Sequence, residues 1–339
     1  MPAPLYLRHA SSLEHDTGLH PEGPGRIPAI EGELERRDWL GYRLVEAPPV
    51  EMETLTRVHP RPYVDSVRAV SERGGGAFDA DTLASAGSYA AALHAAGGAC
   101  AMVDALMSGS SRLGFCGLRP PGHHAEAERA MGFCLFNNVA VAARHALDSL
   151  GVRRVLVFDW DVHHGNGTND IFHDVDDVLF ASIHQSPLYP GTGPPGDTGS
   201  GKGEGHTVNL PVPPGAGEAV WLSLVEHVVV PIARAYGPEL VLISAGFDAH
   251  RADPLAECAL EAESFARMAR WARSVADEVG APVGAVLEGG YDLDALSRSV
   301  AATLEALAAD AGPPESVAPD PLTRSAVARI GARWGLSAG

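Results

Sequence analysis

Four short apolar segments, each followed at once by polar side chains, constrain the fold of this chain more than any other feature of its sequence. The segments are residues 152–158, 178–183, 240–244 and 283–287. They are enriched in β-branched residues and too short for typical helices, so we expect them to be buried strands of a parallel sheet. Ala-rich stretches with helical spacing cover 89–107 and 261–279. The alternation of strands and helices predicts an α/β fold.

A single domain is expected, because no Pro/Gly/Ser-rich linker interrupts the α/β pattern over the 339 residues. The Pro- and Gly-rich segments 186–205 and 211–217 are expected to be long functional loops of a doubly wound sheet. Residues 311–321 have the composition of a linker. The amphipathic stretch 322–334 that follows is expected to form a helix that docks on the body of the domain.

Composition excludes several classes of protein. No run of 18 or more apolar residues is present, and residues 1–13 lack the basic start and apolar segment of a secretory signal, so we expect no membrane span and a cytoplasmic location. The four cysteines form no C-x-x-C pair and are expected to be reduced thiols. With 43 acidic and 25 basic residues, the net charge of −18 should repel nucleic acid and attract cations.

The polar residues at the ends of the four predicted strands are rich in groups that bind metals and transfer protons. They are Asp159, Asp161, His163, His164 and Asn166 after the first strand, Ser182 and His184 at the second, Asp248 and His250 after the third, and Glu288 and Tyr291 after the fourth. Any one of these clusters could belong to an ordinary loop. Because the carboxyl ends of parallel strands meet at one edge of the sheet, four of them predict a single shared site.

The candidate metal ligands are Asp161, His163 and Asp248. Alternate residues of an extended chain point the same way, so Asp161 and His163 are expected to face one side of their strand end. Together with Asp248 they offer two carboxylates and one imidazole, which leaves a metal ion open to water and substrate, as catalytic zinc requires. Zinc is the first expectation, and Fe(II), Co(II) or Mn(II) would also suit these ligands.

Two adjacent histidines, His123 and His124, lie in the Pro- and Gly-containing segment 119–125. On their own, such histidines are more often surface residues than catalytic ones. Asp159 is expected to point to the face of its strand opposite Asp161 and to hydrogen-bond an imidazole. Such a carboxylate would fix the tautomer of the histidine and raise its pKa.

Five motifs occur together in a recognisable order. They are RPPGHHA, GFCLFNN, DWDVHHGNGT, SAGFDAH followed by DPL, and LEGGY. In order and spacing they resemble the zinc-dependent histone deacetylase superfamily, which includes acetylpolyamine amidohydrolases and acetoin-utilisation proteins, and most closely its class II branch with bacterial relatives. The resemblance spans about residues 9–291, with the catalytic motifs at 119–291. It implies the arginase-deacetylase fold, one domain with an eight-stranded parallel sheet between helices.

The resemblance also implies roles for individual residues. Asp161, His163 and Asp248 resemble the zinc ligands, and the implied catalytic residues are His123, His124, Asp159, Asn166 and Tyr291. His124 has Asn166 as its neutral partner, where class I enzymes carry Asp, so it is expected to be the less basic histidine and the general base and acid. His123, oriented by Asp159, would tune the charge and hold the water. Tyr291 would stabilise the oxyanion, and it argues for an active enzyme because some class II members have His there.

A substrate tunnel and a structural potassium ion follow from the same resemblance. The tunnel residues would be Gly132, Phe133, Tyr189 and Leu255, with Phe133 and Tyr189 as aromatic walls around the aliphatic arm of an acetylated amine. Leu255 stands where polyamine-selective relatives carry Glu, so strict polyamine selectivity is not expected. The potassium ligands would be Asp159, main-chain oxygens of Asp161 and His163, the Ser182 hydroxyl and the Ile183 carbonyl.

Three charged residues near this tunnel have open roles. Arg26 is expected at its inner end, near departing acetate. Glu22 and Asp81 are expected either at the rim of the tunnel or, more often for such residues, in solvated salt bridges.

The expected activity is zinc-dependent hydrolysis of an N-acetyl or other short N-acyl amide of a primary amine. The substrate would be acetyl-lysine in proteins, an acetylated polyamine or a small acetylated metabolite. A non-catalytic acyl-lysine binder is one alternative. A two-metal ureohydrolase is another, disfavoured because Gly165 and His250 stand where its second metal would need carboxylates. A homo-oligomer whose segment 186–217 closes the pocket of a partner chain is compatible with the sequence, although no feature demands it.

Overall fold

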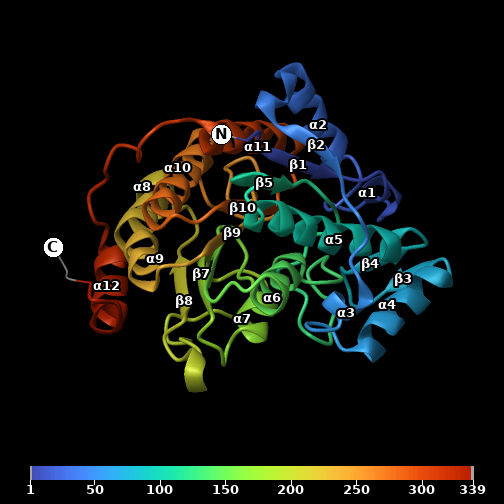
Figure 1. Cartoon of the computed structure of the whole chain (residues 1–339), viewed down its shortest axis with the longest axis horizontal. Coiled ribbons are helices and arrows are strands. Elements are labelled where there is room, and N and C mark those ends of the chain that lie inside the picture. The colour runs from blue at the N-terminus through green and yellow to red at the C-terminus, as the bar shows by residue number, and fades with distance from the viewer. Residues whose placement is uncertain (1, 337–339) are drawn as a thin grey trace.

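An eight-stranded parallel sheet lies at the centre of the computed structural model, which describes residues 2–336 (Figure 1). Its strands, in spatial order, are β2 (Arg43–Glu46), β1 (Leu5–Arg8), β5 (Leu113–Cys116), β10 (Val283–Leu287), β9 (Leu240–Ala245), β6 (Val155–Asp159), β7 (Val178–Gln185) and β8 (Thr207–Val212). A small antiparallel hairpin, β3 (Gly75–Ala77) and β4 (Leu83–Ser85), lies outside the sheet. The eight-stranded parallel sheet that the resemblance implied is confirmed.

Helices cover both faces of the sheet (Figure 1). One face carries α2 (Arg26–Arg36), α8 (Glu218–Leu224), the π-helical turn η3 (Val225–Val229), α9 (Val230–Tyr236), α10 (Ala262–Val279), α11 (Leu293–Ala308) and α12 (Pro321–Trp334). The other carries α3 (Met52–Leu55), α4 (Arg61–Glu72), α5 (Ser88–Met107) and α6 (Asn138–Ser149). The short elements α1 (Ser11–Glu14), η1 (Asp38–Gly41), α7 (Asn166–Ile171) and η2 (Gly201–Gly203) belong to connections.

The two helical layers explain why the predicted strands are apolar throughout. In β6, Leu156 and Phe158 belong to one hydrophobic core, and Val155 and Val157 to the other. Successive side chains of a strand point to opposite faces, so a strand covered on both sides needs apolar residues at every position. The pattern that predicted the strands is therefore a direct result of burial between two layers.

The four strands predicted from sequence are β6, β7, β9 and β10, which are contiguous in the sheet. Their bounds differ slightly, because β6 begins at Val155 and β7 continues to Gln185. The predicted loop 211–217 is wrong at its start, since Pro211 and Val212 are the last residues of β8. β8 is an edge strand, where the missing N–H of proline is tolerated.

The predicted helices at 89–107 and 261–279 are α5 and α10. Glu261 caps α10 in a capping box with Ser264. The helix expected at 322–334 is α12, whose buried residues contact α8 and α9, and Ser223 Oγ lies 2.7 Å from Thr323 Oγ1 across that contact. The four cysteines are buried and free, as predicted.

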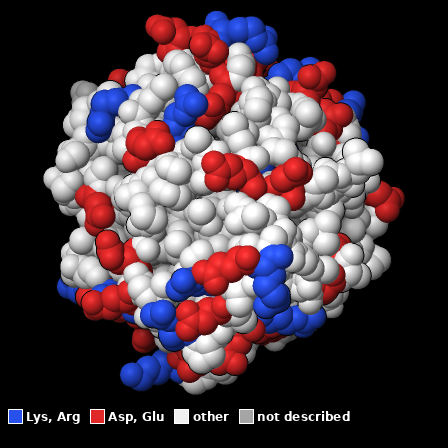
Figure 2. Space-filling view, turned by 90° about the vertical axis from the view of Figure 1, so that its right-hand side faces the viewer, with Lys and Arg blue, Asp and Glu red and all other residues white. Residues whose placement is uncertain are grey.

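Two helical stretches, Ser88–Met107 and Glu218–Tyr236, are long and apolar enough to cross a membrane by composition alone. In this fold 61% of each apolar window is buried inside the protein, as expected for core helices. Figure 2 shows the face on the right-hand side of Figure 1, where acidic and basic side chains are interspersed and acidic ones predominate. That face offers no broad basic surface of the kind that binds a phosphate backbone.

Candidate metal and active site

Asp161, His163 and Asp248 converge beyond the carboxyl ends of β6 and β9. One possible ligand atom from each lies within 4.8 Å of the others, and His163 Nδ1 is 3.1 Å from both Asp161 Oδ1 and Asp248 Oδ2. All three side chains are buried. Burial lowers the pKa of His163, but the two carboxylates outweigh it and raise this pKa to about 10. Two buried carboxylates that converge with one imidazole fit a divalent cation such as zinc.

The turn after β6, rather than strand geometry, brings Asp161 and His163 together. β6 ends at Asp159, and the chain bends through 161–163. Asp161 Oδ1 accepts a hydrogen bond from the backbone N–H of His163 at 2.9 Å, which closes the bend. The expectation of an extended chain here is therefore wrong. Asp159 and Asp161 were expected on opposite faces, yet both approach the ring of His123, at 2.9 Å from Nδ1 and 3.7 Å from Nε2. The two predicted ligands meet because a side chain holds the turn.

Two glycines let the backbone approach the ligand carboxylates. A Cβ atom at Gly246 would collide with the carboxylate of Asp161, and one at Gly289 with that of Asp248. The N–H of Gly289 donates to Asp161 Oδ2 at 2.8 Å, and the N–H of Val162 donates to Asp248 Oδ1 at 2.9 Å. Backbone donors thus fix the orientation of both carboxylates.

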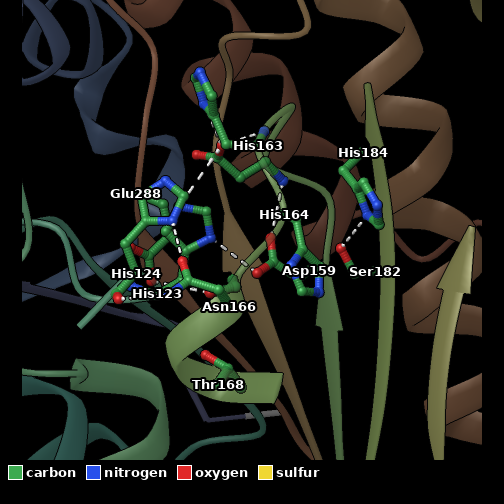
Figure 3. Close-up of polar contacts among 12 residues, drawn as sticks. His123, His124, Asp159, His163, His164, Asn166, Thr168, Ser182, His184 and Glu288 are labelled. Carbon is green, nitrogen blue, oxygen red and sulfur yellow. Dashed lines mark hydrogen bonds and ion pairs between the residues drawn. The ribbon is translucent and has the colours of Figure 1, made fainter. Parts of the chain in front are cut away.

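The ring of His124 is oriented by Asn166, the first residue of α7 (Figure 3). Its Nδ1 is 2.8 Å from Asn166 Oδ1, and Asn166 Nδ2 donates to Glu126 Oε1 at 3.0 Å, so the amide oxygen faces the ring. Because this oxygen can only accept, Nδ1 carries the proton and Nε2 keeps its lone pair. Burial, with further contributions from His123 and His163, holds the pKa of His124 well below its usual value.

His123 has a carboxylate partner instead. Its Nδ1 is 2.9 Å from Asp159 Oδ2, the last residue of β6 (Figure 3). Burial lowers the pKa of His123, but Asp161 and Asp159 outweigh it and hold the value well above the usual one. The ring centroids of His123 and His124 are only 4.1 Å apart. The two adjacent rings therefore differ in basicity because Asp161 and Asp159 raise the pKa of His123, whereas burial and the neighbouring histidines lower that of His124.

Glu288 is a member of the site to which the sequence analysis gave no role (Figure 3). It follows β10 and is fully buried, and its Oε2 accepts hydrogen bonds from the backbone N–H groups of Gly122 at 2.6 Å and His123 at 3.1 Å. Its Oε1 accepts one from Ser244 Oγ at 2.9 Å. Burial raises the pKa of Glu288 to about 7. The motif LEGGY offered a signal, because an acidic residue beside a buried strand needs a partner.

A cavity of about 200 Å³ leads to the metal-binding side chains. It is lined by Asp81, His124, Gly132, Phe133, His163, Leu188, Tyr189, Leu255 and Tyr291. All four residues expected in the substrate tunnel are among them. His250 is not, since its Nε2 lies 3.4 Å from Glu261 Oε2 in a separate groove between α2, α10 and α11. One of the polar residues predicted to share the site therefore faces elsewhere.

A tight turn presents Phe133 to this cavity. Met131 and Cys134 exchange both backbone hydrogen bonds, and the residues between them have positive φ, +55° at Gly132 and +68° at Phe133. This is a two-residue turn of type I′, in which Phe133 adopts a conformation that bulky side chains rarely take. A Cβ atom at Gly132 would collide with the ring of His124. Phe133 also meets the ring of Tyr291 edge to face, with centroids 5.7 Å apart.

Tyr291 lines the same cavity as His124. Its backbone N–H donates to Asp253 Oδ2 at 2.7 Å, and the guanidinium of Arg26 lies 5.3 Å from its ring centroid. Burial, followed by the charges of Asp248 and Asp161, raises the pKa of Tyr291 well above its usual value. The phenol is therefore protonated and able to donate a hydrogen bond into the cavity.

Comparison with known families decides what kind of protein this is. A model described as the histone deacetylase domain matches residues 20–307. The chain belongs to the histone deacetylase family. Membership confirms the resemblance predicted from the five motifs and makes this chain a deacetylase of the amidohydrolase type.

Relatives of this histone deacetylase family member occur in archaea, plants and bacteria. It is 43% identical to a probable deacetylase of Methanothermobacter thermautotrophicus, over 93% of this chain and 94% of the relative. It is 39% identical to the chloroplastic histone deacetylase 14 of Arabidopsis thaliana, over 90% and 77% of the two chains. A histone deacetylase-like amidohydrolase of Pseudomonas aeruginosa is 41% identical, over 74% and 66%.

A solved structure supports the same family. The crystal structure of the HDA15 HD domain matches with a TM-score of 0.90 and 36% sequence identity, over 97% of this chain and 95% of that one. At this level of similarity the two chains share the whole α/β domain.

A buried charge network lies behind the site of this family member. Glu22 is fully buried and accepts hydrogen bonds from Arg119 Nη2 at 2.7 Å and Arg26 Nη1 at 3.1 Å. Burial acts to raise the pKa of Glu22, but Arg119 and His15 outweigh it and hold the value well below the usual one. The expectation of a rim position or a solvated salt bridge for Glu22 is therefore wrong, because its side chain is buried against Arg119 and Arg26 although its neighbour Leu19 is exposed. Asp81 does line the cavity.

Two of the predicted potassium ligands lie side by side, one at the end of β6 and one within β7. Asp159 of β6 pairs with Ser182 of β7 in the sheet, and both are fully buried. Asp159 Oδ1 accepts the backbone N–H of Asp161 at 3.1 Å, and Ser182 Oγ lies 2.9 Å from His184 Nδ1 (Figure 3). Ile183 follows Ser182 in the same strand. A carboxylate, a hydroxyl and nearby backbone carbonyls fit the preference of an alkali cation for oxygen.

Proposed function

We propose that this chain hydrolyses the N-acetyl amide of a primary amine in a zinc-dependent reaction that releases acetate and the free amine. The observation that carries the proposal is that His124 and Tyr291 line one cavity together with His163, one of three convergent metal donors. Acetyl-lysine in proteins or peptides, or an acetylated polyamine or small amine, would be the substrate.

Asp161, His163 and Asp248 would hold the zinc ion. When bound, such an ion polarises a carbonyl oxygen and lowers the pKa of a water molecule beside it. Its positive charge would also offset the pull of Asp161 on the proton of His123.

His124 would take the proton of the attacking water. Its low pKa keeps it neutral, and the Asn166 oxygen at 2.8 Å keeps the proton on Nδ1, so Nε2 is the accepting atom. The same atom would then hand the proton to the leaving amine. His123, oriented by Asp159, would hold the water through its other ring nitrogen.

Tyr291 would donate its phenolic hydrogen to the acetyl oxygen as negative charge develops there. Its raised pKa keeps this hydrogen in place at neutral pH. Phe133, held in its tight turn against Tyr291, would exclude water from that side of the acetyl group.

The dimensions of the cavity suit a linear substrate. About 200 Å³ between Phe133 and Tyr189 is room for one unbranched aliphatic arm with a small acyl group. Leu188 and Leu255 add apolar lining, and Asp81 is the only carboxylate among the lining residues. The carboxylate of Asp81 would favour a cationic substrate, but apolar Leu255 offers no partner for a second ammonium group.

An activity assay with metal analysis tests this proposal. Purified protein is analysed for bound metal and assayed for acetate release from an acetyl-lysine peptide, its trifluoroacetyl version and N-acetylputrescine, beside Tyr291→Phe. Loss of the phenolic donor should lower kcat by about 10²-fold, as for other oxyanion donors. Turnover of none of the three substrates by zinc-loaded wild type would contradict the proposal and favour the acyl-lysine binder.

A ureohydrolase with two metals is less well supported. Its second metal would need carboxylates at Gly165 and His250, and a side chain at Gly165 would collide with the carboxylate of Asp159. His250 faces Glu261 instead of the metal donors. Urea release with Mn(II) would nevertheless reveal such an activity.

We also propose a structural potassium ion at Asp159 and Ser182, with the backbone oxygens of Asp161, His163 and Ile183. Replacing sodium with potassium at constant ionic strength should raise the Tm of wild type, and should raise that of Ser182→Ala by less. Equal Tm values of wild type in the two salts would contradict this site.

A further inference from the structure

The loop that carries the two histidines has no regular structure to hold it. Residues 117–125 follow β5 without regular structure, and their backbone hydrogen bonds go to other elements and to side chains: the N–H of Gly117 donates to Leu7 of β1, and the oxygen of His123 accepts from the N–H of Thr168 in α7 at 3.2 Å. Two other carbonyl groups are held from α6, where Asn138 Nδ2 donates to the oxygen of Pro120 at 3.0 Å and Asn137 Nδ2 to that of Ala125 at 3.2 Å. One side of the loop is thus fixed by two amides.

Two N–H groups of the loop, those of Gly122 and His123, converge on a single side chain, whereas the N–H of Arg119 goes to Ser12 Oγ. Glu288 Oε2 accepts from Gly122 at 2.6 Å and from His123 at 3.1 Å, and among the described residues it is the acceptor of both. The carboxylate itself is tied to β9 through Ser244 Oγ at 2.9 Å. Glu288 therefore connects three parts of the chain: the end of β10, which it follows, β9 through Ser244, and the segment after β5 through Gly122 and His123.

The location of these contacts gives them a consequence for the histidine rings. A hydrogen bond at the backbone nitrogen of His123 fixes the main chain from which the ring of His123 and, one residue later, the ring of His124 extend. Glu288 lies three residues before Tyr291, and the intervening Gly289 donates to the ligand Asp161. The same short segment therefore contacts the histidine loop, a metal ligand and the phenolic donor.

We propose that Glu288 is a positioning residue for deacetylation, whose carboxylate holds the backbone at Gly122 and His123 and so sets the distance of both histidine rings from the metal donors. The inference rests on the proposed function, because it concerns the placement of the histidines in that reaction. Glu288 does not line the cavity, so it acts through the loop and not on the substrate. Misplacement of a catalytic group by about 1 Å can cost about 10²-fold in rate.

Two substitutions at Glu288 separate geometry from charge. Glu288→Ala removes the acceptor and should lower kcat per metal-loaded molecule by about 30- to 100-fold, with KM changed less than about threefold because the cavity lining is intact. Glu288→Gln should recover kcat to within about fivefold of wild type. Its amide oxygen can accept from both N–H groups, and the Ser244 hydroxyl can accept from its NH₂.

A matched control removes a buried hydrogen bond far from the site. Ser223→Ala breaks the contact between Ser223 and Thr323 under α12 and should lower Tm while leaving kcat unchanged. If Glu288 contributed to stability alone, Glu288→Ala would likewise lower Tm and leave kcat unchanged. If Glu288→Ala fails to fold, Ser244→Ala frees one carboxylate oxygen and should still lower kcat about threefold at unchanged KM and metal content.

The outcomes are distinguishable from failure of the proposed function. If wild type releases no acetate, the proposed function fails and not this inference alone. Two outcomes with an active wild type would contradict the positioning role. In the first, folded and metal-loaded Glu288→Ala keeps the wild-type kcat. In the second, Glu288→Gln is as impaired as Glu288→Ala. The first result would assign Glu288 to folding only, and the second would assign its effect to charge.

Discussion

The floor and the rim of the cavity differ in burial and in hydrogen bonding. The floor consists of His124 and His163, which line the cavity, and of Asp161, Asp248 and His123, which contact them, and none of the five is more than 7% exposed. Each of these side chains has a specific hydrogen-bonding partner. The rim consists of Asp81, Leu188, Tyr189 and Leu255, which are partly exposed, 38% in the case of Tyr189.

This difference indicates a division of work. A buried floor with fixed partners holds reacting groups in one geometry, which determines the chemistry. A partly exposed rim built on loops accommodates different substrates and contributes mainly to their relative affinities. Changes in the floor should therefore act on kcat, and changes in the rim on KM and on the choice of substrate.

The largest effect is expected from His124→Ala. Removal of the proton acceptor should lower kcat by about 10²- to 10⁴-fold, the usual contribution of general acid–base catalysis, with KM nearly unchanged. Steady-state kinetics measures kcat and KM. Elemental analysis should find the wild-type metal content in this variant, because His124 is not among the three metal donors. A variant that keeps more than a tenth of the wild-type kcat would show that another group takes the proton.

Gly132→Ala tests where the floor ends. The added Cβ would collide with the ring of His124 at a positive φ of +55°. We expect a loss of stability of about 1 kcal/mol from the backbone strain, and a fall in kcat of about tenfold as the ring is displaced.

Gly191→Ala is the matched control for this change. Gly191 also has a positive φ, +82°, but a Cβ there would meet nothing within 4 Å. Denaturant unfolding should detect a loss of stability in both variants, larger in Gly132→Ala because of the collision with His124, and the assay should detect a loss of kcat in Gly132→Ala alone. Equal kcat values would place the boundary of the floor deeper than Gly132.

The smallest effect is expected at the rim, from Leu255→Glu. A partly exposed carboxylate contributes at most about 1 kcal/mol to an ammonium group, so kcat/KM for N-acetylputrescine relative to a neutral acetyl-lysine peptide should rise about two- to fivefold. The kcat for each substrate should stay within about twofold. A large fall in kcat for both substrates would contradict the separation of rim from floor.

The centre of the fold and the floor of the site were predictable from sequence for the same reason. β6, β7, β9 and β10 are covered on both faces, so their apolar runs are continuous, and the ligands follow them directly in the chain. β1, β2 and β5 have only four residues each, too few for a periodic signal, and β8 is interrupted by Pro211.

The errors have equally specific causes. The bend at 161–163 depends on one hydrogen bond from a side chain to the backbone, which no periodicity records. The burial of Glu22 depends on Arg119, distant in the chain. Glu288 received no role because its partners are backbone N–H groups, which look the same in every sequence.

Metal titration of the stripped protein tests the central claim most directly. Protein treated with a chelator and then dialysed would receive zinc in fractions of an equivalent, while acetate release from the preferred substrate is measured at each step. We expect no activity before addition and a linear rise that ends at one zinc per chain, with Asp248→Ala showing no rise. Full activity of the stripped protein, or an end point at two metal ions, would contradict a single site formed by Asp161, His163 and Asp248.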